Sequence, residues 1–87
     1  MRVTAQPNSR LLGYVHVQVA SRVFVLPVEA RSLTLDDGSV LQPGFFGNQE
    51  GSFGILVDGD APEAVVKETI EHASVDAARH IARSVLN

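Results

Sequence analysis

Polar and apolar residues alternate along the first third of the chain. The segment Leu11–Val19 shows the two-residue period of a strand with one buried face. One face carries Val15, Val17 and Val19, and the other carries Tyr14, His16 and Gln18. We therefore predict a half-buried strand whose polar and aromatic row points away from the core.

A second apolar segment, Arg22–Val28, follows after only two residues and is apolar on both faces, as in a central strand. If Ala20-Ser21 forms the turn, Val17 lies opposite Phe24 and Val15 lies opposite Leu26, so the apolar sets match in a hairpin. Ala-Ser is a poor sequence for a tight turn, which leaves a longer loop as the alternative. Pro27 cannot donate to a ladder, which predicts an end or a bulge of the strand there.

The middle of the chain alternates short apolar runs with turn residues. We predict strands at Arg31–Leu35, Val40–Leu41 and Phe53–Val57, a turn at Asp37-Gly38, and a glycine-rich loop at Pro43–Ser52. Asp58-Gly59 is the predicted turn into the next element.

The last third of the chain has the pattern of one long helix, Ala61–Leu86. Apolar residues recur at steps of three or four at Val66, Ile70, Ala73, Ala77, Ile81 and Val85, which predicts the face that packs on a sheet. Asp60 is the expected N-cap, with Pro62 in the first turn and Glu63 completing a capping-box spacing. We expect the helix to continue through Ser74 without a kink.

This order of elements predicts an α+β fold. We expect an antiparallel β-meander of four to five strands, followed by the C-terminal helix packed on the sheet. A barrel-like curl of the sheet is the architectural alternative. Residues 11–87 form a single domain in this interpretation, and residues 1–10 form a flexible lead-in.

Composition narrows the function classes. The 87 residues carry a formal charge of −3 and no cysteine, which excludes disulfides, thiolate metal sites and a cysteine nucleophile. Lys and Arg are scattered, which disfavours nucleic-acid binding. No apolar run has the length of a membrane span, and the N-terminus lacks the apolar segment of a signal peptide, so we expect a cytoplasmic protein.

Candidate chemistry is sparse. Glu68, His72, Asp76 and His80 recur every four residues, a spacing that could contribute metal ligands together with His16. Steps of four drift around a helix, however, so a solvated polar face is the better interpretation. The glycines match no phosphate-binding fingerprint, and Ser, His and Asp occur without a nucleophile elbow. We predict no catalytic, cofactor or metal site.

The remaining candidates are contact residues. Phe45 and Phe46 lie together in the glycine-rich segment, and either form a lid over the sheet or expose a ring for recognition. Tyr14 and His16 belong to the outward row of the first strand. We expect a small non-catalytic module that self-associates as a homodimer or binds a protein partner. The alternative is a small-molecule-binding domain or minor enzyme, with its site between the first strand and the glycine-rich loop.

Overall fold

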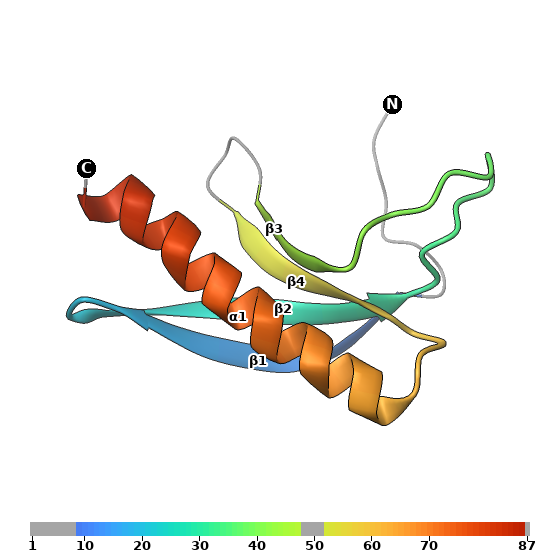
Figure 1. Ribbon diagram of the computed structural model, residues 1–87, viewed down its shortest axis with the longest axis horizontal. Coiled ribbons are helices and arrows are strands. Elements are labelled where there is room, and N and C mark those ends of the chain that lie inside the picture. The colour runs from blue at the N-terminus through green and yellow to red at the C-terminus, as the bar shows by residue number, and fades with distance from the viewer. Residues whose placement is uncertain (1–8, 48–51, 87) are drawn as a thin grey trace.

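The computed structural model describes residues 9–47 and 52–86, and the side chains of Val85 and Leu86 lie outside this description. Four strands form one sheet, and a single helix crosses one of its faces (Figure 1). The elements are β1 Arg10–Val19, β2 Arg22–Arg31, β3 Gly44–Gly47, β4 Phe53–Asp58 and α1 Glu63–Leu86. Most of the lead-in predicted at residues 1–10 falls outside the described residues, but Arg10 already belongs to β1.

The predicted hairpin is confirmed. Val17 pairs with Phe24 and Val15 pairs with Leu26, and only Ala20 and Ser21 separate the paired residues Val19 and Arg22. The poor turn sequence is accommodated because Ala20 adopts a positive φ of 57°. This is the backbone region that the first central residue of a type II′ turn occupies, usually as glycine.

Ala20→Gly is expected to stabilise the protein by about 0.5 kcal/mol. The left-handed conformation costs an alanine about 1 kcal/mol, and the greater freedom of glycine in the unfolded chain offsets part of the gain. Ala20→Val should instead destabilise by more than about 1 kcal/mol, because a β-branched side chain tolerates this φ poorly. Thermal unfolding of the two variants beside the unsubstituted chain measures both effects. A lower melting temperature for Ala20→Gly would contradict the strained turn.

Pro27 does not end β2, contrary to the sequence prediction. The strand continues to Arg31, and the irregularity lies on the partner strand, where the register shifts between Leu11 and Gly13. Pro27 is tolerated because the pairing of β2 with β4 begins only at the next residue, Val28.

The antiparallel meander is also wrong. The order in the sheet is β1-β2-β4-β3, with β2 and β4 parallel and the other two pairs antiparallel. After β2 the chain passes to the far edge, forms β3, and returns as β4 to the centre (Figure 1). The central place suits β4, because Ile55 and Val57 are fully buried and Leu56 on its other side is half-buried. With β1 and β3 at opposite edges the sheet is open, not a barrel.

The segment between β2 and β3 differs from the expectation. The strands predicted at Arg31–Leu35 and Val40–Leu41 are reduced to one bridge between Thr34 and Val40. A turn forms one residue earlier than predicted: the Gly38 N–H donates to the Leu35 carbonyl, so Asp36 and Asp37 are its central residues and Gly38 follows with a positive φ of 89°. The Ser39 hydroxyl and N–H both donate to the Asp37 carboxylate, and these hydrogen bonds lower the pKa of Asp37.

The helix packs by the predicted face. Ala73, Ala77 and Ile81 are buried, and Val66 and Ile70 are half-buried against the same core. The predicted contribution of Val85 lies outside the described side chains. Small residues in the middle of this face let α1 approach the sheet closely, where it meets Val17, Leu26, Val28, Ala30, Ile55 and Val57.

The start of the helix is two residues later than predicted. The first helical residue is Glu63, and the N–H groups of Val65 and Val66 both donate to the Pro62 carbonyl. Asp58, not Asp60, supplies the side-chain bond in this turn, since its carboxylate accepts the Asp60 N–H. Asp60 therefore precedes the cap position. The helix is continuous at Ser74, as expected, and the Ser74 hydroxyl donates to the Ile70 carbonyl.

Candidate interaction surface

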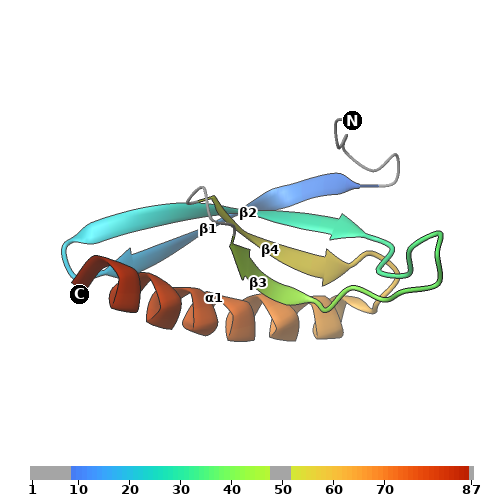
Figure 2. The ribbon, with the colours of Figure 1, turned by 90° about the horizontal axis from the view of Figure 1, so that it is seen from above.

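The helix covers one face of the sheet, and no described element covers the other (Figure 2). We call this second surface the open face. The strand register places on it Leu11, Tyr14, His16 and Gln18 of β1, Val23, Val25, Pro27 and Glu29 of β2, Gly44 and Phe46 of β3, and Gly54 and Leu56 of β4. Five of its apolar side chains are exposed: Leu11, Tyr14, Val23, Val25 and Phe46.

An apolar row crosses the open face perpendicular to the strands. Tyr14 on β1 pairs with Pro27 on β2, and Phe46 on β3 pairs with Gly54 on β4. The parallel pairing of Val28 with Ile55 places the preceding residues, Pro27 and Gly54, at the same level. The exposed rings of Tyr14 and Phe46, with exposed fractions of 59% and 46%, therefore lie at the two ends of one row.

The ring of Phe46 lies close over its cross-strand partner Gly54, which has no side chain. A Cβ atom added to Gly54 would come within 2.6 Å of the Phe46 Cζ atom. The neighbouring cross-strand pair, Gly47 and Phe53, has the same arrangement on the helix side: a Cβ atom on Gly47 would come within 2.7 Å of Phe53 Cδ1. An aromatic ring over a cross-strand glycine shields the backbone that the glycine leaves bare. Gly44 and Gly47, which suggested a loop, thus belong to strand β3, and Gly54 lies in β4 as predicted.

Phe45 and Phe46 point to opposite faces because they are consecutive residues of a strand. Phe45 is half-buried on the helix side, where its ring centroid lies 5.7 Å from that of Phe53 and 5.3 Å from that of His80. Phe53 and His80 also meet, at 5.7 Å. Within the predicted loop Pro43–Ser52, Gly44–Gly47 therefore form strand β3, while residues 48–51 lie outside the described residues. Of the two rings, Phe46 reaches the open face and Phe45 does not.

Tyr14 and His16 are exposed on the outward row of β1, as the alternation predicts. The glycine-rich segment lies at the opposite edge of the sheet, with β2 and β4 between. A small-molecule site between these two segments would therefore have to span the whole open face. The glycine-rich sequence around Phe46 already suggested a contact residue. Which residues lie beside Phe46 across the sheet depends on long-range strand pairing and could not be read from the sequence.

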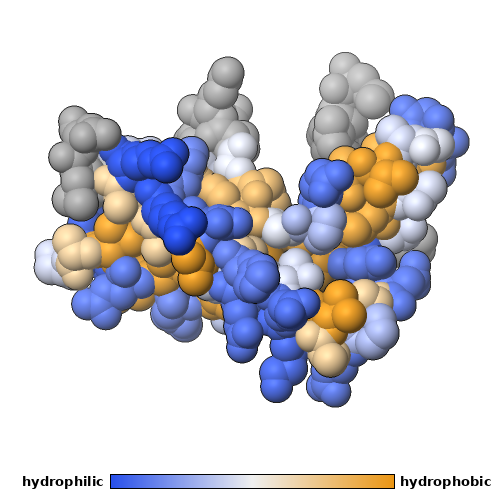
Figure 3. All heavy atoms as spheres, viewed as in Figure 1, coloured by the Kyte–Doolittle hydropathy of each residue, from blue (hydrophilic) through white to orange (hydrophobic). Residues whose placement is uncertain are grey.

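The helix-side surface has a different character. Hydrophilic residues follow the course of α1 in the space-filling view (Figure 3), among them the exposed Glu68, His72, Asp76 and Arg79. Among the described residues no three potential metal ligands come together, and His80 faces Phe45 and Phe53. Within the same part of the chain, no helix combines the length and apolarity that a membrane span requires.

Comparison with known proteins adds no assignment. No family model, no curated protein and no solved structure matches this chain.

Proposed function

We propose that this protein is a non-catalytic self-association module that dimerises by stacking the open faces of two copies. The observation that carries the proposal is the apolar row from Tyr14 through the half-buried Pro27 to Phe46, which runs across the width of the sheet with an exposed ring at each end. Contiguous exposed apolar surface of this kind is typical of an interaction site. Two stacked sheets would form a β-sandwich with a helix on each outer side.

The dimensions of the open face support a second copy as its partner. The molecule measures only 19 Å along its shortest axis, the thickness of one sheet and one helix layer. Four strands spaced about 4.8 Å apart give the face a planar area of about 500 Å². Its side chains raise the accessible area toward the roughly 600–800 Å² per partner that specific interfaces bury, so we expect a dissociation constant on the order of micromolar.

The charges of the face also suit a two-fold arrangement. Glu29 belongs to the open face, and Arg31 follows two residues later on the same side of β2, so both signs occur at the same end of the face. In a two-fold dimer each copy presents the same patch to the other, and a patch with both signs can be its own complement. The cytoplasmic location expected from the sequence remains a prediction.

Sedimentation equilibrium across a range of concentrations tests the proposal. We expect the unsubstituted chain to form a dimer and Tyr14→Lys to weaken it at least tenfold, because a two-fold contact introduces the new charge twice. Val75→Lys is the matched control: Val75 is exposed to a similar degree, 51%, but lies on α1.

Equal effects of the two lysines would show that the open face is not the contact. A monomer at all concentrations up to millimolar would reject self-association and return the open face to screening against protein partners and small molecules.

A further inference from the structure

We propose that the first half of β2 binds an extended segment of another protein as an added strand. In the described structure β2 pairs with β4 only from Val28 onward, although it pairs with β1 along its whole length. Among the described residues, the stretch Arg22–Leu26 therefore has a strand partner on one side only, and we call its other side the free edge. The site is the backbone edge of β2 and adjoins the open face, to which the Val23 and Val25 side chains belong; it goes beyond the proposed function.

The turn identifies which backbone groups are free. The hydrogen bond of the two-residue turn makes Val19 and Arg22 a hydrogen-bonded pair, and such pairs alternate along an antiparallel ladder. Arg22, Phe24 and Leu26 therefore direct their N–H and C=O groups toward β1. Val23 and Val25 direct theirs toward the free edge. Pro27 alternates with Val23 and Val25, so its nitrogen also points away from β1. A residue without an N–H therefore fits at this position of the strand.

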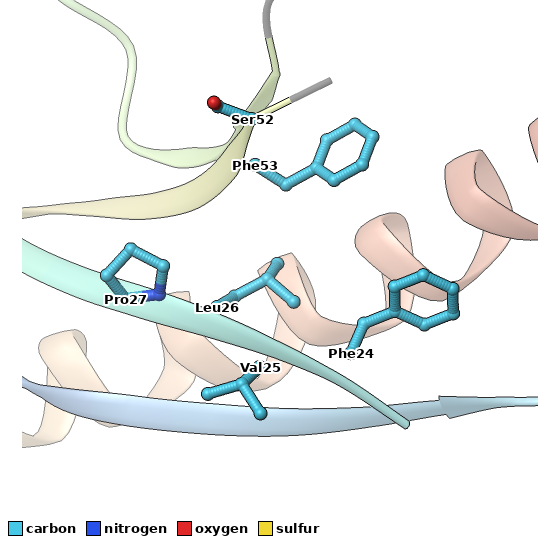
Figure 4. A pocket seen from close by; sticks show the side chains of 6 residues that line it. All are labelled: Phe24, Val25, Leu26, Pro27, Ser52 and Phe53. Carbon is cyan, nitrogen blue, oxygen red and sulfur yellow. The ribbon is translucent and has the colours of Figure 1, made fainter. Parts of the chain in front are cut away.

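A hollow of about 490 Å³ lies beside this free edge. It is lined by Phe24, Val25, Leu26, Pro27, Ser52 and Phe53; Figure 4 shows the first four along β2 and the last two at the start of β4, with α1 behind. Phe24 and Leu26 face the helix side, as does Phe53. An added strand would thus meet backbone partners along its edge and apolar side chains on one face.

The residues of this edge define the chemistry of the partner. Because Val23 and Val25 offer main-chain groups, the partner must present an extended backbone. Its side chains on the helix side should be aliphatic to contact Phe24 and Leu26. The charged residue of the stretch is Arg22, whose guanidinium carbon lies 5.2 Å from the Phe24 ring centroid. A carboxylate at the end of the partner segment complements it.

A single strand fits this edge better than a folded copy of the chain. The free stretch is five residues long, about 17 Å, and Phe53 closes one end of it. We therefore assign the edge to an aliphatic, acidic segment that is extended in the complex.

Amide hydrogen exchange tests the free edge. In the isolated protein, the amides of Val23 and Val25 should exchange at least tenfold faster than those of Phe24 and Leu26. Addition of the peptide Glu-Thr-Val-Thr-Val-Thr-Glu, blocked at both ends, should slow Val23 and Val25 selectively. Its sequence reads the same in both directions, so either strand orientation presents a glutamate to Arg22. Protected Val23 and Val25 amides in dilute protein without peptide would overturn the proposal.

Two pairs of variants test the contacts. Val25→Pro removes a free-edge N–H without touching the pairing with β1, and should lower peptide affinity at least tenfold, whereas Val25→Thr keeps the N–H and should bind within about threefold. Arg22→Glu should weaken the glutamate peptide severalfold and bind the corresponding lysine peptide better. If Val25→Pro fails to fold, the Arg22→Glu variant still tests whether the peptide binds at this edge.

Three outcomes would reject the added strand: no slowing of Val23 and Val25 at millimolar peptide, equal binding by the proline and threonine variants, or an Arg22→Glu variant indifferent to peptide charge. Loss of dimerisation in Val25→Pro, with Tyr14→Lys still dimeric, would show instead that a second copy occupies this edge. Loss of dimerisation in Tyr14→Lys alone, with peptide binding intact, would support both sites.

Discussion

Ile55→Ala is expected to destabilise the protein by about 3–4 kcal/mol. Ile55 is completely buried at the centre of β4, beneath the helix and between two paired strands. Removing its side chain loses the transfer energy and leaves a cavity that the flanking strands cannot close. A domain of this size has a stability of about 4–13 kcal/mol, so the loss is a large part of the total. The melting temperature should fall by about 15–25 °C.

Leu56→Ala is the matched control for this substitution. Leu56 is the next residue of the same strand, but it is half-buried and faces the open side of the sheet. Its truncation should cost about 1 kcal/mol in the monomer, because little cavity forms at an open surface. Chemical denaturation at low protein concentration measures both values. Similar losses for the two variants would contradict the assignment of the core to the helix side alone.

Phe45→Ala and Phe46→Ala should separate folding from association, although the residues are adjacent. Phe45 packs on Phe53 and His80 on the helix side, so its truncation should cost about 2 kcal/mol, less than the 3–5 kcal/mol of a fully buried ring. Phe46 is 46% exposed and rests on Gly54, so its truncation should cost less than about 1 kcal/mol. It should nevertheless weaken the proposed dimer at least tenfold, because an aromatic anchor is lost.

Thermal unfolding at a concentration below dimerisation, together with sedimentation equilibrium above it, distinguishes the two effects. The reverse pattern, with Phe46→Ala less stable and Phe45→Ala less associated, would contradict the strand assignment of β3. Loss of stability in both variants would mean that the two rings form one core cluster.

Elements stabilised by neighbours in the sequence were predictable. The hairpin register follows from two apolar sets separated by a two-residue turn, so Val17 opposite Phe24 could be inferred from spacing alone. The buried face of the helix follows from its 3.6-residue period, which identified Ala73, Ala77 and Ile81. Both patterns repeat over ten or more residues, and each repeat adds to the signal.

The short strands were not predictable in the same way. Gly44–Gly47 has four residues, two of them glycine, and resembles a loop until it pairs with β4, where Phe53 lies over Gly47 and Phe46 lies over Gly54. Val40 and Leu41 have the better strand composition but form only a bridge. Composition is a weak guide for so short a segment, because cross-strand partners supply most of its stability.

The sequence by itself determined the hairpin, the long helix with its buried face, the α+β class, and the outward position of Tyr14 and His16 on their strand. The tertiary structure alone decided that β4 lies parallel to β2 in the centre, that Phe46 shares a face with Tyr14, and that half of β2 pairs on one side only within the described part of the chain. Local periodicity fixes which side of an element is apolar. The path of the connecting segment determines which distant element packs against that side. This path is not encoded in a periodic pattern of residues, so the sequence alone does not predict it.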